Sequence, residues 1–230
     1  MKGRAMPANR TESVERALSI LSAFSTRRPR MTLAELAAET GLHKSTILRL
    51  AGSLQIFGFL DRDAQGRFAI GASVWHLGLI FRQGFATDEI VRPVLRQLVD
   101  TTSETASFFV RAGDDRVCLY RENNAELQKY GVEEGMRLRL GTGASGLVLR
   151  HFSGDDTVPT ELFNSRGTVS LDATRNPNIA SISTPVFSGN GLFCGALTVS
   201  GPNARFDSAT RQAAIPELEK AAQFLSGQMP

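Results

Sequence analysis

The stretch from Thr32 to Leu54 constrains the fold of this 230-residue chain more than any other. It reads TLAELAAETGLHKSTILRLAGSL, in which Thr32 and Glu35 have the spacing of a capping box at the start of a short helix. Gly41 predicts the end of that helix, and a second helix is expected to start near Lys44. Two short amphipathic helices joined by a tight glycine turn are typical of a helix-turn-helix, which places its second helix in the major groove of duplex DNA.

The exposed face of the expected second helix carries the chemistry that DNA contact requires. Apolar residues at helical spacing predict the buried faces, with Leu33, Leu36 and Ala37 in the first helix and Ile47, Leu48, Ala51 and Leu54 in the second. The other face carries Lys44, Ser45, Thr46 and Arg49. The two cations suit phosphates or guanine edges, and the hydroxyls with the first-turn N–H groups suit phosphate. The alternative interpretation is an ordinary helix pair with a solvated basic face.

The segments on either side of this pair complete a small domain. Ser13 is expected to cap a preceding helix, whose apolar positions are Val14, Ala17, Leu18, Leu21 and Phe24. After the pair, Leu60 and Phe68 flank a turn-rich segment that contains Gly66, a pattern that predicts a β-hairpin. A hairpin directly after a DNA-reading helix is a wing, and Arg62 and Arg67 on it would reach the DNA backbone or the minor groove.

Charge and cysteine usage agree with this assignment. Residues 1–85 hold 12 Lys and Arg against 6 Asp and Glu, whereas residues 86–230 hold 14 against 17. A basic front on a mildly acidic remainder suggests that only the front meets a polyanion, although a chance imbalance on a solvated surface is the alternative. The N-terminus lacks the apolar core of a signal peptide, and the apolar stretch 69–81 is too short to span a bilayer. With only Cys118 and Cys194, both in apolar surroundings, we expect a reduced, cytoplasmic protein without membrane contact.

The remainder of the chain is expected to form an α+β domain. Helical spacing predicts helices over 73–83 and 88–102, and Pro93 would lie near the first turn of the second. From Ala106 the period changes to that of strands, which are expected over 107–111, 116–121, 137–140, 182–187 and 195–199. Helices are expected after Ser145 and after Ser208. The pattern indicates a mostly antiparallel sheet flanked by helices.

The run from Gly141 to Gly146 matches the spacing GxGxxG. A dinucleotide site would also need a βαβ unit and an acidic residue after the next strand, and no hydrophobic strand follows at the right distance. We expect instead a strand that feeds a helix through small residues, so that free N–H groups point into a cavity that suits a small carboxylate. Simple close packing of the glycines is the alternative.

Catalysis, metal binding and cofactors are not expected. The three histidines, His43, His76 and His151, show no metal-ligand spacing, and no CxxC is present. Ser145 lacks the GxSxG pattern of a nucleophile elbow. We interpret His43, at the start of the expected DNA-reading helix, as a phosphate or base contact.

The chain resembles the IclR family of bacterial transcription regulators. The resemblance rests on SVERALSILSAF, LAELAAETGLHKSTILRL, GFL, FAIG and HLG within residues 13–80, and it resumes in LGTGASGLVL and ISTPVFSGNGLFCGALTVSGP. In that family the residues that match Lys44, Ser45, Thr46 and Arg49 lie on the DNA-reading helix. With Thr32, His43, Arg62 and Arg67 they form the predicted DNA-contacting set.

The resemblance also implies an organisation and an effector site. It implies a tail over 1–12, a winged helix-turn-helix domain over 13–72, a linker helix over 73–86 that pairs with its twin, and an effector-binding domain over 87–230 similar to GAF and PAS domains. The implied effector residues are Gly143, Ala144, Ser145, Asp172, Ile179, Ser181, Thr198 and Ser200. Because Thr198 and Ser200 alternate along one strand, both hydroxyls can point into one cavity.

This chain departs from the family pattern at three places. Gly146 stands where a lysine is usual, Asp172 stands alone where an acidic pair is common, and the stretch between Phe152 and Arg166 is short for the family. We therefore expect one or two helices that border the effector domain to be reduced or absent there.

We expect a DNA-binding transcription regulator, either repressor or activator, that senses a small carboxylic acid. It would bind operator DNA as a homodimer or a dimer of dimers. One alternative is a constitutive DNA-binding oligomer whose C-terminal domain only mediates assembly. The other is an enzyme or metabolite-binding module with a vestigial helix-turn-helix.

Overall fold

The computed structural model describes residues 10–83, 88–124, 132–141, 143–172 and 178–229. The chain divides into two compact units, Met1–Arg82 and Gln83–Pro230, and each is described by itself. The boundaries expected from the sequence for tail, linker and effector domain stay a prediction.

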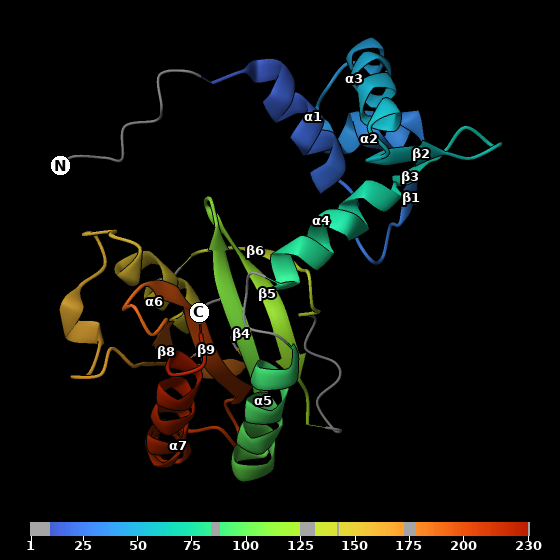
Figure 1. Cartoon of the computed structure of the whole chain (residues 1–230). Helices are drawn as coiled ribbons and strands as arrows, with labels where there is room; N and C mark the ends of the chain where they lie inside the picture. The colour runs from blue at the N-terminus through green and yellow to red at the C-terminus, as the bar shows by residue number, and fades with distance from the viewer. Residues whose placement is uncertain (1–9, 84–87, 125–131, 142, 173–177, 230) are drawn as a thin grey trace. The chain divides into compact units, whose positions relative to one another are not determined.

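The front unit is a helix-turn-helix with a small sheet (Figure 1). Helices α1 (Glu12–Ser22), α2 (Leu33–Thr40) and α3 (Lys44–Ile56) enclose a core that includes Ile20, Leu36 and Ile47. Strands β1 (Arg30–Met31), β2 (Leu60–Arg62) and β3 (Phe68–Ile70) form an antiparallel sheet in the order β1-β3-β2. The helix pair and the wing hairpin predicted from the sequence are therefore confirmed.

The turn between α2 and α3 follows the local signals that predicted it. The Thr32 side chain accepts a hydrogen bond from the Glu35 backbone N–H, and the Glu35 carboxylate accepts from the Thr32 backbone N–H at 2.6 Å. Gly41 has a φ of 69°, a left-handed conformation that a residue without Cβ adopts at little cost, and its N–H bonds the Ala37 carbonyl. These contacts fix where α2 begins and where α3 can start.

Three details of the front unit differ from expectation. Helix α1 starts at Glu12 after Thr11, so Ser13 is not its N-cap. Residues 1–9 of the expected tail lie outside the described part. Leu48 is 42 % exposed, and Leu50 is buried in its place, because positions 47, 50, 51 and 54 complete one helical face. The short strand β1 was not predicted, since two residues show no period.

Helix α4 (Ala72–Gln83) ends the front unit and is apolar on more than one side. It starts one residue before the expected linker helix, and residues 84–86 of that linker lie outside the described residues. Its large side chains at positions 74, 75, 77, 79, 80 and 81 are all more than a third exposed. Apolar surface of this extent on one helix is typical of a surface that another protein segment or a partner covers.

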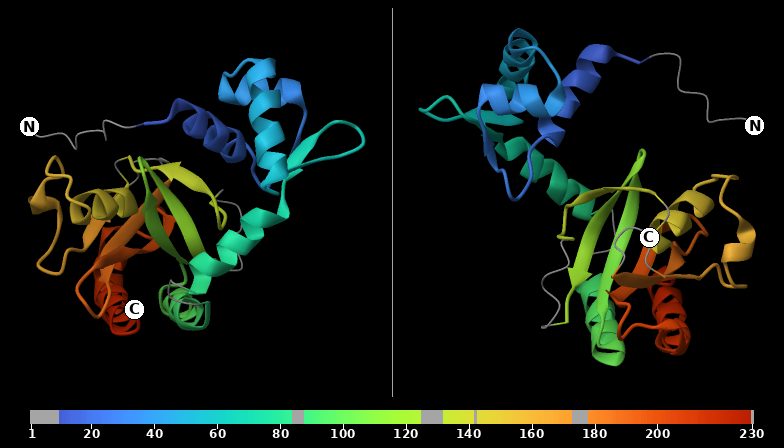
Figure 2. Two further views of the ribbon diagram at one scale, coloured as in Figure 1. Left: turned by 45° about the horizontal axis from the view of Figure 1, so that its top comes forward. Right: turned by 180° about the vertical axis from the view of Figure 1, so that it is seen from behind.

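The back unit is an antiparallel sheet between two helical layers (Figure 2). In the described residues the sheet has the order β6-β5-β4-β9-β8-β7. The strands are β4 (Thr105–Ala112), β5 (Asp115–Glu122), β6 (Arg137–Arg139), β7 (Val169–Leu171), β8 (Ile179–Phe187) and β9 (Phe193–Pro202). Helices α5 (Asp88–Thr102) and α7 (Ser208–Ser226) bury one face, and α6 (Ala144–Phe152) buries the other.

The α+β expectation and the five predicted strands are confirmed, with several corrections at element ends. Strand β7 was missed because three residues are too few to show alternation. Helix α6 begins at Ala144, before Ser145, and α7 begins at Ser208 itself with Asp207 as its capping side chain. Pro93 lies beyond the first turn of α5. After α6 the chain forms one short 3-10 turn, Thr160–Leu162, before it enters β7.

The pairing of β4 with β5 contains one register shift that matters for the site. Phe108 pairs with Tyr120, whereas the next residue, Phe109, pairs with Cys118, so Leu119 is an extra residue in β5. Such a bulge reverses which face each later side chain occupies. Tyr120 accordingly belongs to the core under α5 and α7, and Cys118 to the core under α6.

None of the helices in the described residues combines the length and the apolar character that crossing a membrane requires. The His, Cys, Asp and Glu side chains of these residues form no group of three or more that could hold a metal ion.

The left-handed turn at Gly41 yields a stability prediction. A Cβ there would meet no atom within 4 Å, so Gly41→Ala should cost only backbone strain, about 1 kcal/mol of unfolding free energy. Gly52→Ala, in the middle of α3 and also in open space, should instead stabilise by up to about 1 kcal/mol. Urea unfolding followed by far-UV circular dichroism measures both, and shifts of the same sign would contradict the assigned turn.

Candidate nucleic-acid interface and small-molecule cavity

The start of α3 presents the predicted DNA-contacting residues to solvent. His43 is the N-cap and makes no side-chain capping bond, while the first main-chain bond of the helix runs from Ile47 N–H to the His43 carbonyl. The N–H groups before Ile47 thus have no partner inside the helix. His43, Lys44 and Ser45 are exposed and Thr46 is half-buried. An anion at this end meets free N–H groups and the positive end of the helix dipole.

Lys44 and Arg49 supply the cations of this surface. Both side chains are exposed, and neither makes a hydrogen bond or an ion pair with another described residue. Ser45 and Arg49 lie one helical turn apart on the same face. The surface can therefore offer a guanidinium, an ammonium and a hydroxyl to one partner without first breaking an internal contact.

The other predicted contacts are held by the protein itself. The Arg62 Nε donates to the Gly66 carbonyl at 3.1 Å, and its guanidinium lies 5.0 Å over the Phe68 ring. Arg67 and Arg30 both contact the Asp63 carboxylate, at 2.9 and 3.0 Å. Thr32 is engaged in its capping box. The wing arginines Arg62 and Arg67 are exposed, but each already contacts another residue of the wing. A phosphate would therefore have to bind them in addition to these internal contacts.

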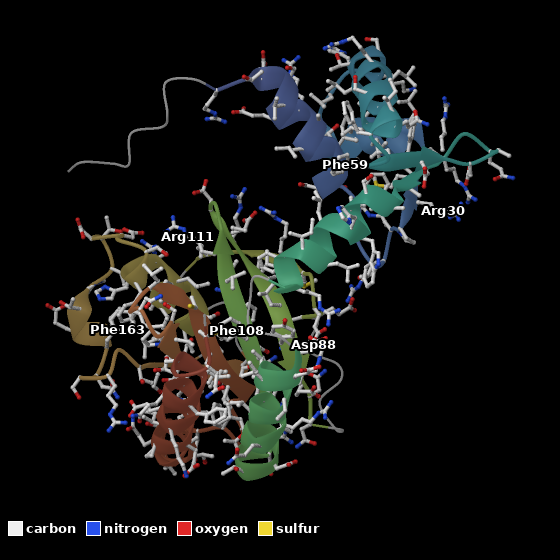
Figure 3. The ribbon with its side chains drawn as sticks, viewed as in Figure 1. Arg30, Phe59, Asp88, Phe108, Arg111 and Phe163 are labelled. Atoms are coloured by element: carbon white, nitrogen blue, oxygen red, sulfur yellow. The ribbon has the colours of Figure 1, made fainter. Side chains whose placement is uncertain are left out.

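An apolar groove lies within the front unit, between α1, α4 and the small sheet. Its described lining residues include Leu18, Phe24, Phe59, Val74 and Leu77, and it measures about 730 Å³. Phe59 and Arg30, both labelled in Figure 3, belong to this lining. Apolar surface of this extent on a small domain marks an interaction site.

A second site, a cavity of about 70 Å³, lies in the back unit at the start of α6. Its described lining residues come from seven segments of that unit and are Phe109, Arg116, Arg121, Val132, Leu138, Gly143, Ala144, Ser145, Ile179, Ser181 and Ser200. Gly143 is the N-cap of α6 and makes no side-chain cap, so the first N–H groups of this helix are also without intrahelical partners.

The cavity brings together six of the eight effector residues predicted from the sequence. Gly143, Ala144 and Ser145 come from the α6 start, Ile179 and Ser181 from β8, and Ser200 from β9. Thr198 is outside the lining. It is 4 % exposed, and its hydroxyl lies 2.8 Å from the Ser183 hydroxyl within the sheet.

Asp172 also lies outside the cavity lining. It forms an ion pair with the buried Arg211 of α7, and 84 % of its own side chain is exposed. Arg211 donates in addition to the Ser170 hydroxyl and the Phe206 carbonyl. In this structure Asp172 joins the end of β7 to α7.

Two arginines of β5 line the cavity and were missed by the sequence reasoning. Arg116 is 5 % exposed, its Nη1 donates to the Leu140 carbonyl at 3.0 Å, and its guanidinium lies 5.5 Å over the Phe109 ring. Arg121 donates to the Ser107 hydroxyl at 3.1 Å and to the Asn123 side chain at 2.8 Å. Regular alternation would put positions 116 and 121 on opposite faces, and the bulge at Leu119 brings both to the cavity.

Cys118 lies between the two arginines on this strand. Burial raises the pKa of its thiol to about 12, and the charges of Arg121 and Arg116 offset only part of that effect. A thiol with so high a pKa holds almost no thiolate at neutral pH. Cys118 therefore contributes packing to this core rather than a nucleophile.

Gly146 lies against the buried arginine. A Cβ at position 146 would lie 1.7 Å from the Leu140 carbonyl oxygen and 2.7 Å from Arg116 Nη1. Both distances are far below contact, so no larger residue fits unless α6 and β6 separate. The glycine that departs from the family pattern is thus the residue that lets Arg116 lie beside the first turn of α6.

Comparison with known proteins gives consistent matches. The family model of the IclR helix-turn-helix domain matches residues 13–64. The chain is 24 % identical to the HTH-type transcriptional regulator KipR of Bacillus subtilis, over 86 % of this chain and 89 % of that protein.

Solved structures share the fold. A putative IclR transcriptional regulator from Silicibacter has a TM-score of 0.78 at 22 % identity, covering 93 % of this chain and 94 % of that one. An IclR homologue from Microbacterium hydrocarbonoxydans, complexed with 4-hydroxybenzoate, has a TM-score of 0.65 at 19 % identity, covering 92 % and 99 %.

The contact at Gly146 predicts a strong local constraint. Gly146→Ala should destabilise the back unit by about 2 kcal/mol, because α6 cannot keep its distance from Leu140 and Arg116. Gly189→Ala is the matched control, since the nearest atom to its Cβ is 4.0 Å away, and it should change stability by less than about 0.5 kcal/mol. Thermal and urea unfolding measure both, and equal effects would refute the assigned packing.

Proposed function

Because this chain belongs to the IclR family of transcriptional regulators, we propose that it binds operator DNA through α3 and the wing and responds to a small organic acid bound in the back unit. The observation that carries the proposal is the exposed start of α3. There two cations without internal partners, a hydroxyl and free backbone N–H groups share one face of a helix-turn-helix.

The DNA-contacting residues have distinct roles in this proposal. Arg49 reads a base edge in the major groove, and Lys44, Ser45 and His43 bind phosphates at the start of the helix. Arg62 and Arg67 on the wing, with Thr32 at the start of α2, add backbone contacts. Helix α3 is rigidly held by Ile47, Leu50 and Ala51, so its exposed face is presented in one orientation.

The effector binds in the cavity at the start of α6. A carboxylate there would accept hydrogen bonds from the first N–H groups of the helix and from Ser145, Ser181 or Ser200. Asp172 and Thr198 would support the site from outside its lining. A ligand that binds one protein arrangement better by about 1–3 kcal/mol changes operator affinity 5- to 150-fold.

A second copy of the chain covers the apolar groove of the front unit. The groove and the adjoining faces of α1 and α4 expose Leu18, Trp75, Leu77 and Ile80, each by half or more. A helix that is apolar on several sides is stable only when covered. A homodimer supplies that cover and also presents two copies of α3 to a two-fold operator.

Operator binding should depend on Arg49. Arg49→Ala should weaken specific binding by about 1–3 kcal/mol and relax sequence preference at one position, because it removes a base contact. Arg139→Ala removes another exposed arginine, from the back unit, where 82 % of the side chain is exposed, and should have no effect. Gel shift with the DNA upstream of the gene measures both. Unchanged affinity in Arg49→Ala removes this residue from the reading role.

Dimer formation should depend on the apolar face of α4. Leu77→Asp places a charge in the groove and should convert the dimer to a monomer with weaker operator binding, measured by light scattering after gel filtration. Leu192→Asp, at a 69 % exposed leucine of the back unit, is the control and should stay dimeric. Fluorescence of Trp75, the only tryptophan, should shift to the red in the monomer. A dimer that persists in Leu77→Asp would exclude this face.

The function as a whole is tested by gel shift in a series of salt concentrations and carboxylic acids. Specific, salt-sensitive binding that one acid strengthens or releases supports the ligand-responsive regulator. Specific binding that no acid changes supports the alternative, a constitutive DNA-binding oligomer. Absent or salt-insensitive binding excludes both.

A further inference from the structure

The wing hairpin is organised around one carboxylate, that of Asp63. Its Oδ1 accepts hydrogen bonds from the backbone N–H groups of Gln65 at 3.1 Å and of Arg67 at 2.9 Å. The Asp63 carbonyl accepts from the Gly66 N–H, and Gly66 has a φ of 79°. These bonds close the loop over residues 64–66, and both an aspartate before such a loop and a left-handed glycine at its end are typical of hairpin turns. One oxygen of Asp63 therefore shapes the turn of the wing.

The other oxygen of Asp63 binds two arginines. Its Oδ2 accepts from Arg67 Nε at 2.9 Å and from Nη1 of Arg30 on β1 at 3.0 Å; Figure 3 labels Arg30. The Asp63 side chain is only 16 % exposed, whereas those of Arg30 and Arg67 are 55 % and 45 % exposed. Two cations thus share one anion that is mostly shielded from water, and both still present a large part of their surface to solvent.

No other carboxylate of the described residues binds these two guanidiniums. Arg30 and Arg67 make no further ion pair within that part of the chain. Arg67 is near enough to Glu35 of α2 for its charge to act on that carboxylate, but the two make no direct bond. Glu35 is already bound by the N–H and the hydroxyl of Thr32. Without the charge of Asp63, both guanidiniums would therefore keep their full charge at the wing.

The charge of the wing bears on the choice between operator and other DNA. A guanidinium that binds phosphate raises the affinity for a duplex of any sequence, because every duplex carries the same phosphates. Specificity is the difference between the affinity for the operator and the affinity for the rest of the DNA. A carboxylate that offsets part of the charge of two arginines, and fixes their direction, lowers the second affinity more than the first.

We propose that Asp63 is a positioning residue of the wing that determines DNA specificity. Its carboxylate holds Arg30 and Arg67 in one direction and offsets part of their charge, so that the wing adds little affinity for DNA of arbitrary sequence. The proposal rests on the proposed function, because it assumes that the wing contacts DNA. It assigns a role in recognition to an acidic side chain that acts only through the two arginines.

The test is fluorescence anisotropy of the full-length protein with two labelled duplexes, the DNA upstream of the gene and a scrambled sequence, in a series of salt concentrations. Asp63→Asn keeps an oxygen for the turn and removes the charge. It should bind the scrambled duplex about three- to tenfold more tightly at low salt, with a salt dependence steeper by about one phosphate contact. The preference for the upstream DNA should fall. Asp63→Glu restores the charge and should return both quantities toward the wild-type values.

Two further variants separate the release of the arginines from a general change in charge. Asp61→Asn removes the same charge from an exposed aspartate of β2 that makes no hydrogen bond or ion pair with a described residue. It should have a much smaller effect, because no guanidinium is released. Arg67→Gln combined with Asp63→Asn should remove most of the gain, since the two positions are coupled through one contact.

The outcomes distinguish this proposal from the broader one. Equal effects of Asp61→Asn and Asp63→Asn, or weaker binding of the scrambled duplex by a folded Asp63→Asn protein, overturn the role of Asp63. The DNA-binding function then stands if Arg49→Ala still weakens binding to the upstream DNA, and both fail if the wild type binds neither duplex. Circular dichroism monitors the fold. Asp63→Ser, whose hydroxyl also accepts bonds in such turns, replaces the Asn variant if that variant unfolds.

Discussion

One extra residue in β5 determines which side chains meet at the cavity. Without the bulge at Leu119, Arg121 would lie under α5 and α7, and Tyr120 would occupy the face that α6 covers. The two arginines would then never share a wall. Phe108 and Phe109 lie on opposite faces of β4 by ordinary alternation, and each anchors a different core (Figure 3 labels Phe108). The charge of the cavity is thus a consequence of sheet register rather than of local sequence.

The strand register buries Arg116, and neighbouring residues must accommodate its charge. Removing a guanidinium from water costs several kcal/mol unless hydrogen bonds and charges compensate. The Leu140 carbonyl and the Phe109 ring compensate in part, and both come from segments that β5 itself positions. Gly146 is then required, because a Cβ there would lie 1.7 Å from the Leu140 carbonyl oxygen that binds this guanidinium. A buried charge beside the first turn of a helix is typical of a binding site rather than of a stabilising core.

The parts of the fold that local chemistry determines could be predicted from the sequence. The capping box at Thr32 and the left-handed Gly41 act within a few residues, so the helix-turn-helix followed directly. Strands β1 and β7 are too short to carry a period. Arg116 and Arg121 could not be found, because a bulge depends on pairing with β4 and leaves no mark in the sequence. Leu48 was predicted to be buried because it is apolar. The helical phase set by the buried Ile47 and Ala51 instead places position 48 on the exposed side of α3.

The contacts around Arg121 connect the cavity to the start of the back unit. Its backbone N–H donates to the Glu134 carboxylate, which also forms an ion pair with Arg92 of α5. Arg92 forms further ion pairs with Glu122 of β5 and with Asp88 of α5. Arg92 therefore ties the first turns of α5 to the strand whose side chains line the cavity, and its guanidinium lies 5.5 Å over the Tyr120 ring. Coupling between sites needs a contiguous set of packed and charged groups with more than one arrangement. The ion pairs of Arg92 and the bond from Arg121 to Glu134 form such a contiguous set. Helix α5 is the first helix of the back unit along the chain.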